Sequence, residues 1–387
     1  MVQAIRSGLS LRKTARRFDV SASTVAYWVE RARGQRLDRV DFEDRMCGLR
    51  QAWNRTPRRL EQRILRLRRA LREHSVLGEY GARSIQSALA ATEREWPAPS
   101  LATINRVLAR HGVMDRVRRM RRPPPPKGWY LPAVAKGRAE LDCFDFIEDL
   151  KIARGPLVSV LTATSLHGGQ TDSWVQERRS AKTTVKSLCQ RWRRDGLPAY
   201  AQFDNDTVFQ GAHQFADTIG RVSRLCLALG VIPVFAPPRE PGFQNAIEGF
   251  NGLWQSKVWQ RVPVRNPPDL QRYADRYVAA HRARNARRRE QAPARRPFPK
   301  HFRFNPRATL HGILIFLRRT DASGRVSVLG RKLAVSSDWP HRLVRCEVNL
   351  TRHRIDCYAL RRRAPLVQAL LTSIHYHRTD KPFKGGL

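Results

Sequence analysis

The sequence predicts a multidomain protein with an α-helical N-terminal region that includes a helix-turn-helix, an α/β core and a small all-β domain at the C-terminal side. Helical spacing of apolar residues dominates the first part of the chain and stops before four consecutive prolines, Pro123–Pro126. From Glu140, strand and helix patterns alternate, which predicts a mixed sheet flanked by helices. From Ile313, short strands separated by tight turns return.

These changes of pattern place the expected boundaries. We expect two helical units, a basic linker, the α/β core, a second basic linker, a small β-barrel and a tail, at residues 1–50, 51–116, 117–135, 136–290, 291–310, 311–365 and 366–387.

Composition restricts the function classes. The chain has 73 Lys and Arg against 33 Asp and Glu, a formal net charge of +40, which favours polyanionic partners. No run of about 20 apolar residues and no signal-peptide pattern is present, so we expect a soluble cytoplasmic protein without membrane contact. Six widely spaced cysteines lack CxxC pairs, which argues against a zinc module or a disulfide framework.

The segment LSLRKTARRFDVSASTVAYWVERAR has helix-turn-helix spacing. Ser10 can cap the first helix, and Ser21 or Ser23 the second. An ordinary helical hairpin is the alternative, but the clustered basic residues favour DNA binding. The expected contacts are Arg12, Lys13, Arg16 and Arg17, with Ser23, Thr24, Tyr27 and Arg31 on the second helix.

A second helical unit runs from about Thr56 to Gly112. Its last segment, SLATINRVLARHG, begins at a Pro99-Ser100 helix-start signal. This segment has the form of a second recognition helix, with Thr103 and Arg106 exposed; a packing helix in a linker domain is an equally good interpretation.

Acidic residues in the α/β core occupy positions suited to metal binding. Asp142 lies in the first predicted strand and Asp204 at the end of a later one, where ligands collect in α/β sheets. Glu248 lies on the polar face of a helix whose other face carries Ile247, Phe250, Trp254 and Val258. Converging carboxylates repel each other unless a cation lies between them. We therefore expect Mg²⁺ or Mn²⁺, as two ions that clamp the oxygens of a phosphoryl displacement.

This core resembles the DDE-type transposases of bacterial insertion sequences, relatives of retroviral integrases with an RNase H-like core. The resemblance is carried by ELD at Asp142, QFDND at Asp204 and APPREPGFQNAIEGFN at Glu248. It implies that Asp142, Asp204 and Glu248 are the catalytic and metal-binding residues, and that Asn205 and Asn245 support the site. It also implies binding to double-stranded element ends and target DNA, assembly as a homo-oligomer, and a nucleoid-associated location in a prokaryote.

Three departures from the family pattern bear on the site. Asp206 replaces the usual glycine, so strain in the metal-site loop is the expected consequence. Thr162, Ala163 and Thr164 stand where an acidic pair is common. Asp145 competes with Asp142 as the first ligand; alternation sends the two side chains to opposite faces of the strand, and the distance from Asp142 to VLTATS favours Asp142.

Five short strands with Gly or Asp turns after Ile313 predict a small SH3-like barrel. Its arginines form either a phosphate or partner-binding surface or a solvated face. These are Arg318, Arg319, Arg331, Arg345 and Arg361–Arg363.

The sequence therefore predicts a transposase or integrase that binds element ends, cleaves DNA and transfers strands with a divalent metal. Two alternatives remain. One is a catalytically inactive helix-turn-helix regulator, such as a domesticated transposase. The other is an RNase H-like nuclease that cuts DNA without joining strands.

Overall fold

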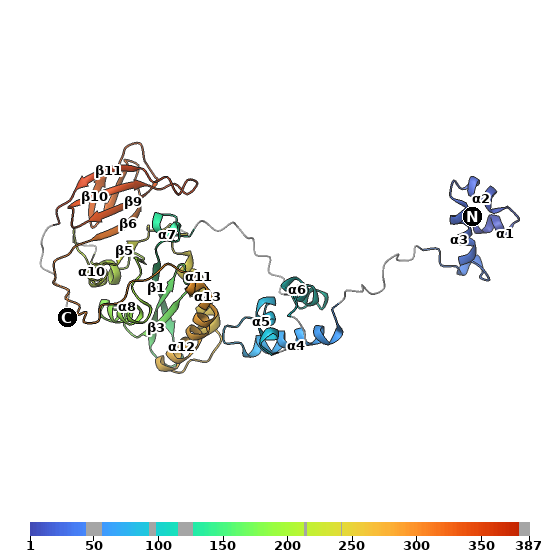
Figure 1. The fold of residues 1–387 in the computed structure, drawn as a ribbon, viewed down its shortest axis with the longest axis horizontal. Helices are drawn as coiled ribbons and strands as arrows, with labels where there is room; N and C mark the ends of the chain where they lie inside the picture. The colour runs from blue at the N-terminus through green and yellow to red at the C-terminus, as the bar shows by residue number, and fades with distance from the viewer. Residues whose placement is uncertain (44–55, 93–97, 115–126, 213–214, 241, 379–387) are drawn as a thin grey trace. The chain divides into compact units, whose positions relative to one another are not determined.

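The computed structural model describes residues 1–43, 56–92, 98–114, 127–212, 215–240 and 242–378 (Figure 1). The chain divides into two compact units, Met1–Glu61 and Gln62–Leu387. The four prolines and the arginines of the first predicted linker lie outside the described residues, as does Cys47.

The first unit is a small helical domain. It contains α1 (Val2–Arg6), α2 (Leu11–Arg17), α3 (Ala22–Arg31) and the short 3₁₀ helix η1 (Leu37–Arg39). Ser10 caps α2 and Ser21 caps α3, each by accepting a hydrogen bond from the backbone N–H three residues later. Val25 on α3 and Ala15 on α2 are buried. The predicted helix-turn-helix is confirmed, with α1 preceding its two helices.

The second helical segment contains α4 (Arg58–His74), α5 (Ala82–Thr92) and α6 (Leu101–Arg110). Ser100 caps α6 by accepting from the Thr103 N–H, as the Pro99-Ser100 signal predicts. Ile85 on α5 and Ile104 on α6 are fully buried. Each helix therefore presents one apolar side to its neighbours.

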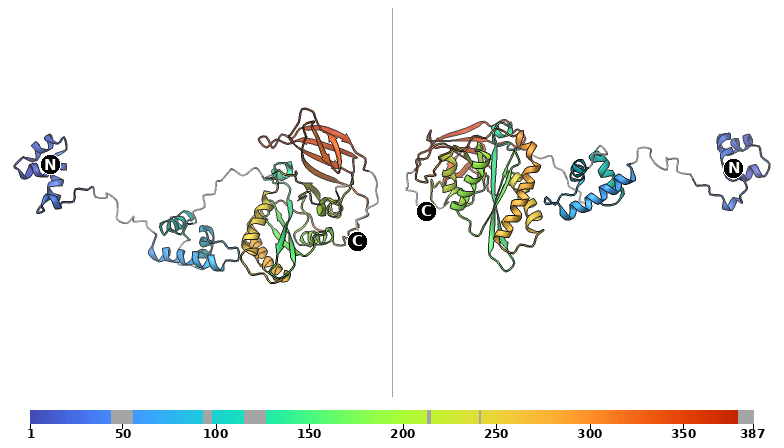
Figure 2. Two further views of the ribbon diagram at one scale, coloured as in Figure 1. Left: turned by 180° about the vertical axis from the view of Figure 1, so that it is seen from behind. Right: turned by 60° about the horizontal axis from the view of Figure 1, so that its bottom comes forward.

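A nine-stranded mixed sheet forms the centre of the second unit (Figures 1 and 2). Its order is β11-β10-β9-β6-β5-β4-β1-β2-β3. The five core strands are β1 (Leu141–Lys151), β2 (Leu157–Ser165), β3 (Thr171–Gln176), β4 (Tyr200–Phe203) and β5 (Ile232–Phe235). β1, β2 and β3 are antiparallel, whereas β4 pairs in parallel with both β1 and β5.

Helices cover both faces of these strands. On one face, α8 (Ala181–Asp195), α9 (Thr207–Gln210) and α10 (Arg221–Ala228) pack against a core that includes Phe144 and Phe203. The second core includes Leu141, Ile147 and Phe250 and lies under α11 (Asn245–Trp254) and α12 (Pro267–Arg284). The π-helical turn η2 (Gln255–Trp259) continues α11, and α13 (Ala286–Glu290) follows α12. The predicted RNase H-like architecture, a mixed sheet flanked by helices, is confirmed.

The core begins earlier than the sequence predicts. Trp129, Tyr130 and Leu131 are buried, and α7 (Pro132–Ala135) follows them. The Tyr130 hydroxyl donates to Gln202 on β4 at 2.5 Å. The end of the predicted linker is therefore part of the core.

The predicted β-rich C-terminal region is present, but its strands continue the central sheet. They are β6 (Ile313–Arg319), β7 (Arg325–Val328), β8 (Arg331–Ala334), β9 (Leu343–Asn349), β10 (Arg354–Ala359) and β11 (Leu370–His375). β6 pairs in parallel with β5 and antiparallel with β9, while β7 and β8 form a separate hairpin. β11 lies within the segment predicted as a tail. Among the described residues, no helix is both long and apolar enough to cross a membrane.

Candidate functional site

Strand β1 carries the two acids that compete for the first position, and it sends them to opposite faces of the sheet. Asp142 lies on the α8 face, where it contacts Arg191 and Trp192. Asp145 lies on the α11 face, where it contacts Asn251. The predicted alternation of these two side chains is what the structure shows.

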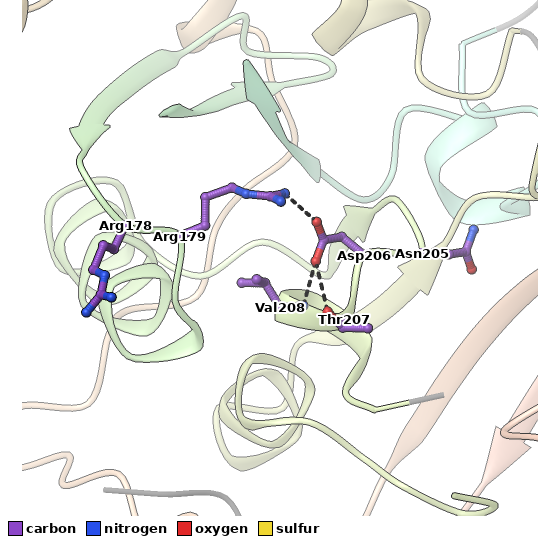
Figure 3. A pocket seen from close by; sticks show the side chains of 6 residues that line it. All are labelled: Arg178, Arg179, Asn205, Asp206, Thr207 and Val208. Atoms are coloured by element: carbon purple, nitrogen blue, oxygen red, sulfur yellow. Dashed lines mark hydrogen bonds and ion pairs between the residues drawn. The ribbon is translucent and has the colours of Figure 1, made fainter. Parts of the chain in front are cut away.

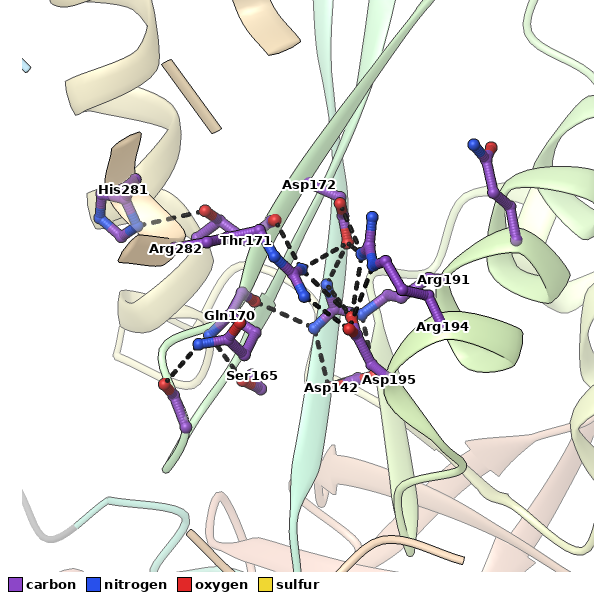
Figure 4. Close-up of polar contacts among 12 residues, drawn as sticks. Asp142, Ser165, Gln170, Thr171, Asp172, Arg191, Arg194, Asp195, His281 and Arg282 are labelled. Carbon is purple, nitrogen blue, oxygen red and sulfur yellow. Dashed lines mark hydrogen bonds and ion pairs between the residues drawn. The ribbon is translucent and has the colours of Figure 1, made fainter. Parts of the chain in front are cut away.

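Asp142 is completely buried inside an ion-pair network (Figure 4). Its carboxylate accepts two hydrogen bonds from the fully buried Arg191, at 3.0 and 3.1 Å, and one from the Trp192 indole at 3.1 Å. Arg295 also pairs with it. Burial alone would raise the pKa of Asp142, but Arg191 and Arg295 lower it below its ordinary value.

The network extends beyond Asp142 to the neighbouring elements. Asp172 on β3 accepts hydrogen bonds from Arg191 and Arg194. Asp195, at the end of α8, accepts from Arg282. Arg282 brings α12 into this group by pairing with Asp195 and by donating to the Thr171 carbonyl at 3.2 Å. These contacts tie β1, β3, α8 and α12 together.

This environment corrects the expected convergence of Asp142, Asp204 and Glu248. The Asp142 carboxylate is occupied by Arg191, Arg295 and the Trp192 indole, and no part of the residue reaches solvent. The structure therefore does not bring Asp142 together with the other two predicted acids. The acid that it brings to them is Asp145.

Asp145, Asp204 and Glu248 form an acidic cluster. The parallel register pairs Cys143 of β1 with Gln202 of β4, so two further residues along each strand set Asp145 level with Asp204. Asp145 and Glu248 line one cleft of about 510 Å³, together with Glu148 and Asn251. Glu248 is exposed on α11, as the helical periodicity predicts, while Ile247 and Phe250 are buried.

Electrostatics show that these acids share one environment. Burial and, to a lesser extent, the neighbouring charges of Asp204, Glu248 and Glu148 together raise the pKa of Asp145 to about 7, against an opposing hydrogen bond from the Phe146 N–H. Burial also raises the pKa of Asp204. Like charges in a half-buried site therefore hold a proton at near-neutral pH unless a cation replaces it.

Asn251 and Thr162 fix the Asp145 carboxylate, and sequence reasoning missed both roles. The Asn251 amide donates to Asp145 Oδ2 at 2.9 Å, and the Thr162 hydroxyl donates to Asn251 Oδ1 at 2.6 Å. Both side chains are buried. The position of Asn251, three residues after Glu248 on the predicted polar face, was the available signal.

The turn after β4 carries Asp204 and Asp206. Asp204 Oδ1 accepts from the Asp206 N–H at 2.9 Å, and Asp206 in turn caps α9 through the Val208 N–H at 2.7 Å. Arg179 pairs with Asp206 (Figure 3) and also with Glu148. Asp206 has φ −59° and ψ 142°. The expected backbone strain from replacing glycine is therefore absent, because this conformation suits any residue.

The two predicted supporting residues have different surroundings. Asn205 donates from Nδ2 to the Ala236 carbonyl at 2.7 Å and accepts at Oδ1 from Arg318 at 2.9 Å. Asn245 is the exposed first residue of α11. A second hollow of about 700 Å³ is lined by Arg178, Arg179, Asn205, Asp206, Thr207 and Val208.

The donor chemistry of the acidic cluster fits a hard divalent cation, because carboxylate oxygens are the ligands that Mg²⁺ and Mn²⁺ prefer. Burial and the neighbouring acids raise the pKa of Asp145, and a bound cation would act in the opposite direction. Within the described ranges, no three His, Cys, Asp or Glu side chains already stand close enough together to hold one ion. Glu248 is exposed, so it is the side chain with room to move toward the two aspartates.

The predicted DNA-contact residues of the first unit are mostly exposed. Exposed side chains include Arg12, Lys13, Arg16, Arg17, Ser23 and Tyr27. Thr24 is half-buried at the start of α3, where its hydroxyl contacts Ser21 at 2.7 Å. Arg31 departs from the expectation: its side chain is only 6% exposed, pairs with Asp41 at 3.1 Å and lies over the Trp28 ring. On α6, Arg106 is exposed and Thr103 half-buried.

Comparison with known proteins gives one sequence family and several solved structures. Residues 2–34 match the family of Psq-type helix-turn-helix domains. The catalytic core domain of bovine immunodeficiency virus (BIV) integrase is similar at 14% identity and a TM-score of 0.28, covering 36% of this chain and 81% of that one. The HTLV-2 integrase catalytic core domain in complex with magnesium has 10% identity and a TM-score of 0.27, with coverages of 36% and 81%.

A third similar structure is the simian T-cell lymphotropic virus intasome in complex with PP2A regulatory subunit B56 gamma. It has 12% identity and a TM-score of 0.32, and covers 64% of this chain and 81% of that one. At these TM-scores the likenesses add no argument to the fold, which rests on strand order and helix placement. The chain combines a Psq-type helix-turn-helix domain, which indicates DNA binding, with a mixed sheet of the kind predicted for an integrase-like core.

Asp142→Asn tests the buried network. The variant removes the carboxylate shared by Arg191 and Arg295, and losing one partner of a buried pair costs about 3–5 kcal/mol. We expect a lower free energy of unfolding in urea by that amount. Arg272→Gln, which breaks an exposed pair with Asp269 at 2.5 Å, is the control and is expected to change it by less than about 1 kcal/mol. Unchanged stability with lost Mn²⁺ binding would instead make Asp142 a metal ligand.

Asp145→Asn tests the repulsion in the acidic cluster. An aspartate whose pKa is raised to about 7 in the fold binds more protons than in the unfolded chain between about pH 4 and pH 7. The metal-free protein therefore loses stability as pH rises through that window. Removing the charge should make the melting-temperature difference, variant minus wild type, more positive at pH 8 than at pH 5, by about 2–4 °C per kcal/mol relieved.

The measurement is thermal unfolding in a metal chelator at both pH values. The amide has one acceptor oxygen where the carboxylate has two, and the cost of this loss does not depend on pH. It therefore cancels when the melting-temperature differences at the two pH values are compared. Glu177→Gln, on an exposed side chain, is the control and should give the same difference at both pH values. An equal difference for Asp145→Asn at pH 5 and pH 8 would show that the cluster is not repulsive.

Proposed function

We propose that this protein is a metal-dependent transposase or integrase that cleaves DNA and transfers strands at the acidic cluster. The observation that carries the proposal is the cluster itself: Asp145, Asp204 and Glu248 come from two adjacent strands and one helix, share one half-buried environment and lie in a strongly basic chain. Acids gathered in this way are unfavourable without a cation.

In this proposal Asp145 replaces Asp142 as the first metal ligand, with Asp204 and Glu248 as the other two. Bound Mg²⁺ or Mn²⁺, as two ions, would activate the attacking oxygen and stabilise the leaving oxygen of an in-line phosphoryl displacement. Asn251 and Thr162 hold the Asp145 carboxylate toward the cleft. Asp206 holds the turn that carries Asp204, by donating its N–H to that carboxylate.

The same residues account for proton balance at the site. At neutral pH about half of the free protein carries a proton on Asp145, because the pKa of that carboxyl is raised to about 7. Loading the site therefore releases that proton, and divalent-metal affinity should rise with pH up to about that value. The exposed Glu248 approaches from α11 without disturbing the buried face of that helix.

DNA recognition is assigned to the helix-turn-helix domain. Ser23 and Tyr27 are exposed on α3, and the basic residues Arg12, Lys13, Arg16 and Arg17 are exposed on α2. We assign the reading of base edges to side chains of α3 and phosphate contacts to the basic residues of α2. Thr103 and Arg106 on α6 are proposed as a second contact. Because two element ends must be joined together, the working form is proposed to be a homo-oligomer on DNA.

The central test measures cleavage and joining of labelled double-stranded DNA that carries the genomic sequences flanking the coding region, with Mg²⁺ or Mn²⁺. We expect wild-type protein to give joined products. Asp145→Asn, Asp204→Asn and Glu248→Gln should each lower product formation at least about 100-fold, because each removes metal-binding charge, while DNA binding is retained. Calorimetric titration of the same proteins with Mn²⁺ alone should show the corresponding loss of metal affinity.

Other outcomes separate the alternatives. Wild-type protein that binds DNA, binds no Mn²⁺ and gives no products would be a helix-turn-helix regulator. Cleaved but unjoined DNA would identify a nuclease. Activity that survives in Asp145→Asn would exclude Asp145 as the first ligand.

Tyr27→Ala and Lys13→Ala test the two modes of DNA contact. Loss of a base-reading side chain should weaken binding to the flanking sequence by about 1–3 kcal/mol and reduce its preference over unrelated DNA. Loss of a phosphate contact should weaken binding to both DNAs equally and reduce the salt slope by about one. Fluorescence anisotropy across a salt series measures both effects. Phe215→Ala, at another exposed aromatic side chain, is the control; equal effects from Tyr27→Ala and Phe215→Ala would contradict the assignment.

A further inference from the structure

Arg318 on β6 is a buried arginine whose hydrogen-bond acceptors are all uncharged. Its guanidinium donates to the Leu317 carbonyl at 2.8 Å, the Ser327 carbonyl at 3.1 Å and the Ala236 carbonyl at 3.3 Å. Its fourth acceptor is Asn205 Oδ1 at 2.9 Å. Within the described residues, no carboxylate takes part in this set of contacts.

A buried guanidinium held only by neutral oxygens costs free energy. Burial lowers the pKa of Arg318 to about 10, so the side chain remains charged at neutral pH without a neutralising partner. An apolar side chain of similar volume would avoid that desolvation cost. The stability of the fold is therefore a poor explanation for this arginine, and its contacts point to a positioning role.

Two of those contacts involve the residue that follows Asp204, since Arg318 donates to Asn205 and also to the Ala236 carbonyl that Asn205 contacts. The Asn205 amide is hydrogen-bonded on both sides: Oδ1 accepts from Arg318, and Nδ2 donates to the Ala236 carbonyl. Figure 3 shows its amide turned away from Arg179 and Asp206, toward the opposite side of the turn. Because Ala236 directly follows β5, this pair of hydrogen bonds ties the end of β4 to the end of β5.

The C-terminal strands also hold the segment that leads to Glu248. Glu240 lies between β5 and α11, and it pairs with Arg319 on β6 and with Arg362 beyond β10. Arg318 and Arg319 are consecutive, so one strand end contacts the chain segments that lead to Asp204 and to Glu248. These two contacts come from opposite faces of β6.

We propose that Arg318 is a positioning residue of the acidic cluster. Through Asn205 it fixes the direction in which the chain leaves β4, and so the place of the Asp204 carboxylate. The C-terminal strands are then a working part of the catalytic core. The consequence for metal binding rests on the proposed function, whereas the ordering of the Asp204 turn does not.

A double-mutant cycle tests this role in the full-length protein. Arg318→Met and Asn205→Ala remove the same contact from its two ends, and the double variant combines them. Arg224→Met is the matched control, because Arg224 is another buried arginine that donates to backbone carbonyls, those of Ile219 and Pro306. Mn²⁺ affinity is measured by calorimetry and amide exchange of residues 204–208 by mass spectrometry.

If Arg318 positions the cluster, each single variant weakens Mn²⁺ binding about tenfold, and the double variant is no weaker than either one, since coupled residues are non-additive. Exchange at residues 204–208 becomes faster in Arg318→Met and Asn205→Ala. Arg224→Met leaves both measurements unchanged, and combining it with Asn205→Ala gives the same result as Asn205→Ala alone. Multiplying losses from Arg318→Met and Asn205→Ala would overturn the inference.

The two levels of the proposal fail separately. Absence of Mn²⁺ binding in wild-type protein would reject the proposed metal site, and the positioning role would then be decided by exchange alone. Unchanged exchange at residues 204–208 in both single variants would overturn the positioning role whatever the metal result. If Arg318→Met does not fold, Asn205→Ala still tests the contact, because it alters the half-buried turn and leaves the interior of β6 intact.

Discussion

The buried carboxylate of Asp142 is the interaction on which the geometry of the site depends. Arg191 and Trp192 reach it from α8, and Arg295 reaches it from the segment after α13. A buried ion group of this kind is geometrically demanding, because any displacement leaves a charge unpaired in a low-dielectric interior. The start of β1 is therefore held in one place relative to α8. The position of Asp145, three residues farther along the same strand, follows from that anchor.

Two acids on one strand thus have opposite electrostatic environments. Arginines lower the pKa of Asp142 below its ordinary value, whereas burial and neighbouring acids raise that of Asp145 to about 7. The first carboxylate is permanently charged and committed to the fold. The second exchanges its proton near neutral pH, as the metal ligand proposed above would do on binding a cation. Environments that push two pKa values apart mark a division of roles.

Local patterns predicted much of this arrangement, and long-range contacts decided the rest. The buried positions of Ile247 and Phe250 and the exposure of Glu248 follow from helical periodicity alone. Alternation along β1 correctly separates Asp142 from Asp145, but it does not say which face holds arginines. That depends on Arg191 and Arg295, which lie 49 and 153 residues away from Asp142. Sequence spacing carries no information about such partners.

The same distinction explains the other differences. Asp206 adopts extended backbone, caps α9 and pairs with Arg179. A family pattern with glycine at this position does not predict these contacts. The C-terminal strands are each predicted by their own residues. Their union with the core depends on the β5–β6 pairing, which joins Val234 to Ile315 and Phe235 to Phe316. Backbone hydrogen bonds form this pairing, and because every strand has the same backbone groups, the sequence does not identify which strands pair.

The arginines of the chain occupy two kinds of environment, the protein interior and the neighbourhood of the acidic cluster. Some arginines are withdrawn into the interior, as Arg191 and Arg318 show, and these cannot contribute to DNA binding. Around the acidic cluster, Arg179 pairs with Glu148 and Asp206, both of which neighbour Asp204 electrostatically. One guanidinium cannot balance these two carboxylates together with Asp145, Asp204 and Glu248. An excess of carboxylates therefore remains among these side chains in a protein of net charge +40, and a divalent cation can offset it, whereas a polyanion would add to it.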